Sequence, residues 1–336
     1  ACGQKFKNRE ISCHSEKLRK CNGKLPETIL EIAQKKGKAT GLVATSQISH
    51  ATPAAFAAHC PNRYCGAEIA RQYVADTKVD LVLGGGVYKT KQNYNCRQFA
   101  ASWQGLGAKY HNATCQEKFV DLAQRQGYTV IRDKKGIDHA ISGVNNKLVG
   151  LFKAYGKGKT PELFRLKQFG MDVPKYPEDE PTLPEMTSAA LNVLEKDKNG
   201  FFLLVEGSQI DWANHTNDDK DGSVGSNNES ALKYQLAETL AFNRAVVKVK
   251  DWLSQVDGRR KNTLIVVVSD HDTGGFAING PSGSLAEKGD VVEGGWTTGG
   301  HTAEDSVIWS QGPGSSHLGR PLDNTDLFQV MKKVLN

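Results

Sequence analysis

The 336-residue sequence carries 43 Lys and Arg against 37 Asp and Glu, a net charge of +6, with 38% hydrophobic and 24% charged residues. This composition excludes a disordered or fibrous chain, and the length suffices for one large domain or two ordinary ones. The basic residues are scattered and not interleaved with aromatic residues, so we expect no nucleic-acid binding function. The longest apolar runs, 201–205 and 264–268, have the length of strands, so we expect no membrane span.

Helix-like and strand-like stretches alternate along the chain. The N-terminal third predicts a helix over 26–36 with Pro26 in its first turn, a strand over 40–44 and a helix beginning at 51. A strand over 79–83 then runs into three consecutive glycines. Further along, the sequence predicts strands over 201–205, 263–269 and 306–309 and helices over 187–196, 232–253 and 326–334.

The runs over 201–205 and 263–269 are apolar without alternation, which is typical of strands buried on both faces of a parallel sheet. The fold class predicted is therefore α/β, a three-layer α/β/α sandwich with a large, mainly parallel central sheet. No interdomain linker is evident. We expect a single domain over 1–336 with loop insertions near 89–115 and 153–184.

Seven cysteines, none in a zinc-ribbon or redox CxxC spacing, favour an oxidising compartment over buried free thiols. We therefore expect a secreted protein, periplasmic or extracellular. By proximity in the sequence, the candidate pairs are Cys13 with Cys21, Cys60 with Cys65 and Cys96 with Cys115, which leaves Cys2 over.

Metal-ligand types gather directly after the strand over 201–205. Glu206 follows it, and Asp211 and His215 lie four residues apart, so one helical turn would present both to a single ion. Ligands of open α/β sheets bind beyond the carboxyl ends of the strands. A carboxylate with an imidazole suits zinc more than calcium.

A second group follows the strand over 263–269. Asp270 and His271 are adjacent, and a sharp turn could direct both toward a second ion. His301 follows a glycine-rich loop over 294–300. Each residue alone has a structural explanation, as a helix cap or a hydrogen-bonded histidine, but together they indicate a metal site.

Four segments resemble, in order, elements of the alkaline phosphatase family. They are GLVATSQISHATPAAFAAH over 41–59, EGSQIDWANH over 206–215, SDHDTGG over 269–275 and GHT over 300–302. The resemblance runs over nearly the whole chain. It implies a metal-dependent hydrolase of phosphate monoesters at alkaline pH, acting on small phosphomonoesters and releasing inorganic phosphate, with a homodimer as a possible assembly.

The resemblance also implies two Zn²⁺ ions. Asp211, His215 and His301 would bind the first zinc ion. Asp270 and His271 would bind the second, together with an Asp expected upstream of Ala1.

One Mg²⁺ ion is implied as well, held by oxygen ligands from Glu206 and Thr52 with His50 nearby. His50 replaces an Asp of some relatives, which predicts weaker magnesium retention or a different ion. Trp212 stands where relatives often carry Lys or His, which predicts weaker phosphate binding and faster product release.

Arg63 matches the residue that clamps two phosphate oxygens with its planar guanidinium. We expect a Cys60–Cys65 bridge to hold its loop, although Cys65 could instead pair with Cys96. The loop sequence is CPNRYC, with Arg63 between the two cysteines.

The family's nucleophile is a serine in a D-S-x-x-x-A-T segment, which we expect upstream of Ala1 together with the first strand. Neither Ser208 nor Ser269 has the matching context, so residues 1–336 alone are expected to form no phosphoenzyme. Two alternatives stay open: a related bimetal phosphodiesterase or sulfatase, and a catalytically inactive protein that binds metal or phosphate.

Overall fold

The computed structural model describes residues 1–16, 20–86, 115–143, 146–152, 179–215, 217, 229–256, 258–279 and 293–335. The insertions expected near 89–115 and 153–184 fall almost wholly outside these residues. Among the described helices, none combines the length and the apolar character needed to cross a membrane.

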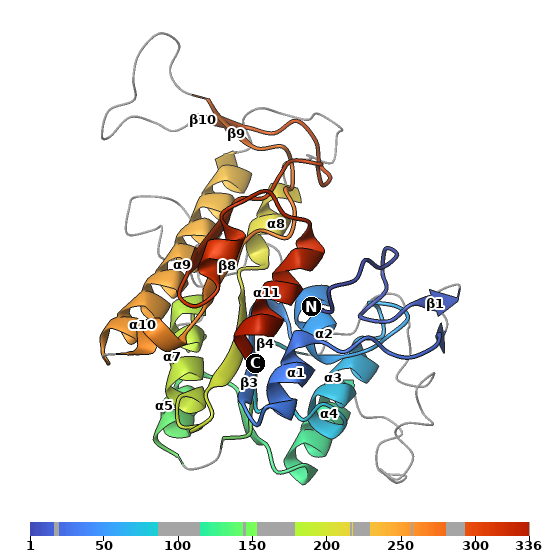
Figure 1. Cartoon of the computed structure of the whole chain (residues 1–336), viewed down its shortest axis with the longest axis vertical. Coiled ribbons are helices and arrows are strands. Elements are labelled where there is room, and N and C mark those ends of the chain that lie inside the picture. Colours follow the sequence, from blue (N-terminus) through green and yellow to red (C-terminus); the bar gives the residue numbers. More distant parts are fainter. Residues whose placement is uncertain are drawn as a thin grey trace.

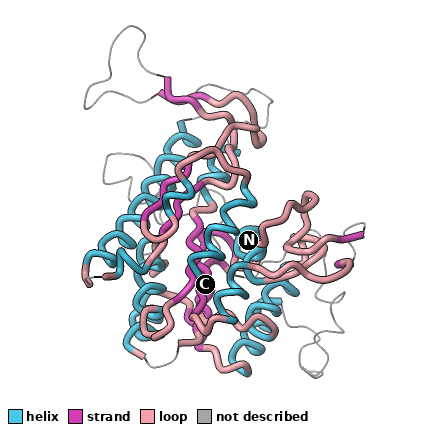
Figure 2. The backbone as a smooth tube through the Cα atoms, viewed as in Figure 1, coloured by secondary structure: helices cyan, strands magenta, loops and turns pink. Residues whose placement is uncertain are grey.

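A five-stranded sheet forms the centre of the molecule (Figure 2), and all of its strand pairs are parallel. β3 lies between β4 and β7, so that Gly41 of β3 is level with Leu81 on one side and Leu203 on the other. The strands in spatial order are β5 (Thr129–Ile131), β6 (Leu148–Phe152), β4 (Leu81–Gly85), β3 (Ala39–Gln47) and β7 (Phe201–Glu206).

Helices cover both faces of this sheet (Figure 1). The adjacent residues Leu42 and Val43 of β3 point into different apolar clusters, because successive side chains of a strand face opposite sides. The three-layer α/β class is therefore confirmed. Leu42 faces α1 (Ile29–Lys35), α2 (Ala51–Ala57), α3 (Gly66–Ala75) and α4 (Cys115–Arg125), and Val43 faces α5 (Lys134–Ser142), α7 (Leu183–Leu194) and α9 (Glu229–Ser254).

The strand predicted over 263–269 is present, but its pairing and its burial differ from the prediction. β8 (Ile265–Val268) pairs antiparallel with β11 (Ile308–Gln311), and within the described part of the chain these two strands form a sheet of their own. Every residue of β8 and of β7 is partly exposed. The reason is that β7 lies at the edge of the sheet and β8 has one partner in the part of the chain that the structure describes, so these residues cover neither strand on both sides.

Shorter elements surround this framework. The hairpin of β1 (Ser15–Glu16) and β2 (Lys20–Cys21) precedes α1, and α11 (Asn324–Leu335) packs on α1 through Phe328. The rest are α8 (Gln209–His215), α10 (Arg259–Asn262), β9 (Ala277–Asn279), β10 (Glu293–Gly295) and the 3-10 helix η3 (Ser315–Leu318).

The first helix begins later than the sequence predicts. Thr28 accepts a hydrogen bond from the Glu31 N–H, and the Glu31 side chain accepts one from the Thr28 N–H, a capping box that starts the helix at Ile29. Pro26 therefore lies before the helix. The helix predicted to begin at 51 is confirmed as α2, whereas α3, α4 and α5 were not predicted.

The cysteines follow the proximity prediction in one of two described cases. Cys13 and Cys21 form a disulfide, but Cys60 and Cys65 are buried free thiols, so the bridge expected around Arg63 is absent. The two thiols are hydrogen-bonded to each other, which raises the pKa of Cys60 and lowers that of Cys65. The side chains of the third expected pair lie outside the described residues.

His59 joins three segments of the N-terminal half. Its Nδ1 donates to the Ser12 carbonyl at 2.6 Å, and its Nε2 lies 3.1 Å from Glu31 Oε1. Burial alone would lower the pKa of His59, but the bonds to Glu31 and Ser12 outweigh burial and raise the pKa above 6.5. The same pair, with the capping bonds, lowers the pKa of Glu31 despite its burial.

A Glu31→Gln variant tests this ion pair, because glutamine keeps the capping box and removes the charge. Since the folded pKa of His59 is raised, its stabilisation is complete below about pH 6.5 and is lost as the pH rises through the folded value. We expect the variant to melt roughly 2 °C below the parent at pH 6 in EDTA, with the gap closing toward alkaline pH.

Glu27→Gln is the matched control, since Glu27 pairs with Lys35 on the exposed surface and no histidine titrates there. A gap between Glu31→Gln and the parent that stays constant from pH 6 to alkaline pH would contradict the ion pair.

Candidate functional site

Chemically active side chains meet at the carboxyl ends of β7 and β8. Glu206 is the last residue of β7, and α8 directly after it carries Asp211 and His215. Asp270 follows β8, and His301 comes from the loop before β11. This is the end of a parallel sheet at which ligands bind.

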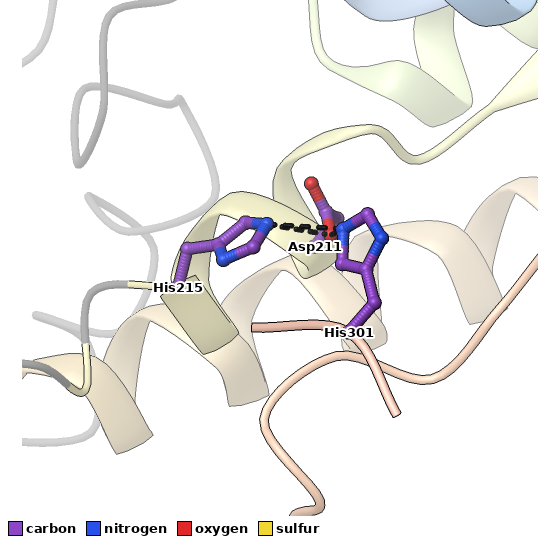
Figure 3. A group of neighbouring side chains, drawn as sticks. All are labelled: Asp211, His215 and His301. Atoms are coloured by element: carbon purple, nitrogen blue, oxygen red, sulfur yellow. Dashed lines mark hydrogen bonds and ion pairs between the residues drawn. The ribbon is translucent and has the colours of Figure 1, made fainter. Parts of the chain in front are cut away.

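Asp211, His215 and His301 form a compact triad of ligand types (Figure 3). One ligand atom from each residue lies within 4.8 Å of the others. The Nε2 atoms of both histidines are 3.3 Å from Asp211 Oδ1 and 3.1 Å from each other. The structure thus brings together three side chains that the resemblance assigns to one zinc ion.

Neighbouring groups orient the triad. The Nδ1 of His215 donates to the Gly299 carbonyl at 2.7 Å, which leaves the Nε2 lone pair directed at the site. The Thr273 hydroxyl donates to Asp211 Oδ1 at 2.6 Å. Thr273 and His301 also form an antiparallel bridge, so one short pairing brings two distant segments together.

Asp270 and His271 lie beside the triad. His271 Nε2 is 3.3 Å from Asp270 Oδ2, and the His271 ring stacks on that of His301 with centroids 3.7 Å apart. The side chain of Asp270 is 72% exposed, so its carboxylate is accessible to an ion from solution. The pair predicted as a second group is thus adjacent to the first.

Glu206 carries its charge in an unfavourable place. Its carboxylate oxygen Oε2 is buried and accepts no hydrogen bond, although the residue as a whole is partly exposed. Burial raises the pKa of Glu206 to about 7; hydrogen bonds from Thr52 and Ser208 oppose this shift, and the charges of Asp270 and Asp211 add to it. A cation at Oε2 would remove this penalty.

His50, Arg63 and Trp212 form the adjacent wall. An Arg63 Nη2–H donates to His50 Nε2 at 3.0 Å, and the rings of His50 and Trp212 meet edge to face with centroids 5.5 Å apart. Burial and then the charge of Arg63 lower the pKa of His50 to about 4, against the opposing effect of Asp211, so His50 is neutral. Its Nδ1 is buried with no hydrogen-bond partner.

These residues fit metal ions. The triad offers two imidazole nitrogens and one carboxylate, the donor set of a zinc site with an open position. The uncompensated oxygen of Glu206 beside the Thr52 hydroxyl suits a hard cation that takes oxygen ligands.

Sequence reasoning missed the residues that hold the ligands in place. Asp272 accepts hydrogen bonds from the Thr302 hydroxyl at 2.6 Å and from the Gly275 N–H at 3.0 Å, which joins the two ligand loops. Thr273 supports Asp211 as described above. Asp272 and Thr273 stand in the DHDTGG segment that the sequence analysis singled out. The sequence of this segment does not indicate which residues they contact.

The two serines beside the ligands are engaged elsewhere. The Ser208 hydroxyl forms a buried hydrogen bond of 2.9 Å with Ser46 Oγ and another with Glu206, and the Ser269 hydroxyl donates to the His271 carbonyl at 2.6 Å. With its hydroxyl engaged in this way, neither serine is placed to act as the nucleophile.

Comparison with known proteins gives one family. A model of alkaline phosphatase matches residues 1–294. Alkaline phosphatase 3 of Bacillus subtilis (strain 168) is 29% identical over 94% of this chain and 71% of its own length. Alkaline phosphatase from the Antarctic bacterium TAB5 is 26% identical, with a TM-score of 0.66 over 99% of this chain and 81% of its own. A mutant of that enzyme with Mg bound superposes equally well, at 0.66 over the same shares and at 26% identity.

Two variants test whether the triad binds zinc. Asp211→Asn removes the charge that both histidines face, and Thr273→Val removes the hydroxyl that orients it. We expect Thr273→Val to weaken zinc binding by about 10- to 100-fold and Asp211→Asn to weaken it further, measured by competition with a chromogenic chelator. Thr129→Val on the exposed start of β5 is the matched control. An unchanged affinity for zinc in both site variants would rule out the triad as the zinc site.

Proposed function

The chain belongs to the alkaline phosphatase family, and we propose that it hydrolyses phosphate monoesters at alkaline pH, with two zinc ions and one magnesium ion and through a phosphoserine intermediate. The observation that carries the proposal is the triad of Asp211, His215 and His301 beside the buried Glu206 carboxylate. Phosphoryl transfer needs positioned cations more than covalent chemistry from the protein, and this site concentrates ligands for cations.

Zinc ligands come from both groups in the proposal. Asp211, His215 and His301 would hold one ion, and Asp270 and His271 would contribute to the other. Zinc ions, when bound, lower the pKa of a nucleophilic hydroxyl or water and stabilise the attacking and leaving oxygens. The hydrogen bond that His215 donates to the Gly299 carbonyl and the one that Thr273 donates to Asp211 keep the ligand atoms oriented before any ion arrives.

Glu206 and Thr52 are assigned to magnesium, with His50 nearby. This assignment is supported by the buried, unpaired Oε2 of Glu206, by the hydrogen bond that Thr52 donates to the Glu206 carboxyl group, and by the magnesium bound in the TAB5 mutant. Because His50 is neutral, it adds no positive charge that would repel a cation.

Arg63 is assigned to the phosphate group. In this structure its guanidinium donates one hydrogen bond to His50, which leaves other donors of its planar fork for two phosphate oxygens. Trp212 meets the His50 ring edge to face and offers no charge. Among the described residues assigned to this site, Arg63 is thus the one cationic side chain for phosphate, which favours release of the product.

We also propose that a further strand lies between β7 and β8 in the whole protein. Within the described residues β7 pairs with β3 alone and β8 with β11 alone. Leu203 of β7 and Ile265 of β8 pack on the same apolar cluster around Trp252, and the charge of Asp270 after β8 acts on Glu206 at the end of β7. A strand inserted there would cover both edges, and residues after it would supply the nucleophilic serine and a further ligand to the second zinc ion.

The substrate class can be tested on the native enzyme with three chromogenic esters. We expect p-nitrophenyl phosphate to be hydrolysed faster with rising pH, with loss of activity in EDTA and recovery when zinc and magnesium are added. Bis(p-nitrophenyl) phosphate and p-nitrophenyl sulfate should react at least about 100-fold more slowly. Faster turnover of the diester or the sulfate would assign a different hydrolase, and binding of phosphate without turnover of any ester would assign an inactive binding protein.

A further inference from the structure

The segment Arg9–Ser12 lies along the loop that carries Arg63. Ile11 and Cys60 exchange two backbone hydrogen bonds of 2.9 Å each, and the Arg63 N–H donates to the Arg9 carbonyl at 2.7 Å. Ser12 extends the contact, because its carbonyl accepts from His59. The backbone of the Arg63 loop is therefore hydrogen-bonded at Cys60 and at Arg63 to a segment about 50 positions earlier in the chain.

The Arg9–Ser12 segment adopts backbone conformations that side-chain-bearing residues rarely take. Arg9 has φ of 78° and Ser12 has φ of 43°, and Lys78 is the one other non-glycine residue with positive φ in the described part of the chain. Such conformations carry strain and persist where the surrounding contacts enforce them. The left-handed turn at Arg9 is what presents its carbonyl to the Arg63 N–H.

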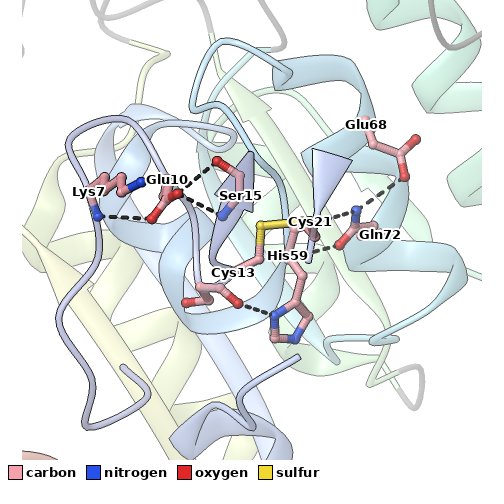
Figure 4. Close-up of a disulfide and its surroundings, with 9 residues drawn as sticks. Lys7, Glu10, Cys13, Ser15, Cys21, His59, Glu68 and Gln72 are labelled. Carbon is pink, nitrogen blue, oxygen red and sulfur yellow. Dashed lines mark hydrogen bonds between the residues drawn. A yellow bond between two sulfur atoms is a disulfide. The ribbon is translucent and has the colours of Figure 1, made fainter. Parts of the chain in front are cut away.

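Glu10 enforces this turn (Figure 4). The residue is 8% exposed, and its carboxylate accepts hydrogen bonds from the Lys7 N–H at 2.9 Å and from both the N–H and the hydroxyl of Ser15 at 2.7 Å. A carboxylate that binds several donors in a buried place holds them firmly, because ionised acceptors form the stronger hydrogen bonds. Glu10 thus ties together both ends of the turn that contains Arg9.

Two further contacts support the same turn. The Cys13–Cys21 disulfide closes the hairpin that follows it, as Figure 4 shows, and the Arg9 guanidinium lies over the Tyr64 ring at 5.5 Å from the centroid. Tyr64 directly follows Arg63. The Arg63 loop therefore gains its support from the segment Arg9–Ser12, which precedes the N-terminal hairpin, and not from the Cys60–Cys65 bridge that the sequence suggested.

We infer that Glu10 is a positioning residue for phosphate binding, which acts through the Arg9 carbonyl on Arg63. This inference rests on the proposed role of Arg63. A loop held in its binding conformation loses less freedom when phosphate binds, so the affinity is higher than that of a loose loop. Loosening the turn weakens phosphate binding without touching any ligand or reacting atom.

The test is Glu10→Gln in the native, metal-loaded enzyme, with Glu16→Gln as the matched control on the exposed side of the same hairpin. The readouts are the inhibition constant of inorganic phosphate, kcat and KM for p-nitrophenyl phosphate, and Tm. We expect Glu10→Gln to raise the inhibition constant and KM by about threefold to tenfold, more than it changes kcat, and Glu16→Gln to change none of them.

Arg63→Ala separates the inference from the proposed function. If Arg63→Ala leaves phosphate inhibition unchanged, the proposed role of Arg63 fails. If Arg63→Ala weakens inhibition and Glu10→Gln does not, the inference alone is overturned. In the Arg63→Ala background we expect Glu10→Gln to have no further effect, and a full effect there would also overturn the inference. Ser15→Ala, which removes one hydroxyl from the turn, makes the same test if Glu10→Gln fails to fold.

Discussion

The burial of the Glu206 carboxylate, beside two further carboxylates, is the constraint on which the site depends. Glu206, Asp211 and Asp270 come from different elements, yet the charges of the latter two act on Glu206, whose Oε2 is buried without a partner. A buried carboxylate oxygen of this kind is costly unless a cation neutralises it. The neighbouring histidines add nitrogen ligands and the neutral His50 adds no competing charge, so the arrangement is one that binding of divalent ions would stabilise.

The fold meets this constraint by bringing strand ends and loops together. The parallel order of the central sheet places Glu206 at the same edge as the segment that leads into α2, with Thr52 and His50. The pairing of Thr273 with His301 joins the loops after β8 and before β11. Arg63 is supported from outside the sheet, by the segment Arg9–Ser12 before the N-terminal hairpin. The metal ligands thus stand on the framework of the sheet, whereas the phosphate ligand depends on a separate small substructure.

Sequence reasoning reached the fold class from local patterns, and it reached the composition of the triad from the resemblance to the family, which adds His301 to the pair Asp211 and His215. Unbroken apolar runs indicated a covered parallel sheet, and the spacing of Asp211 and His215 placed them on one helical turn. Contacts between distant segments were not predictable. The pairing of Ile11 with Cys60 and the role of Glu10 depend on a strained turn, and no residue pattern predicts that turn. The expected Cys60–Cys65 bridge was wrong because proximity in sequence does not determine which sulfurs bond. The partial exposure of β8 likewise depends on which strands lie beside it.

Anomalous diffraction at the zinc absorption edge, from crystals of the native enzyme grown with zinc, tests the account most directly. The account predicts an anomalous peak at the triad, about 2.0–2.1 Å from the Nε2 atoms of His215 and His301 and about 2.0–2.2 Å from an Asp211 oxygen. A zinc-saturated crystal with no anomalous peak at these three side chains, or with its zinc bound only at other residues, would contradict it.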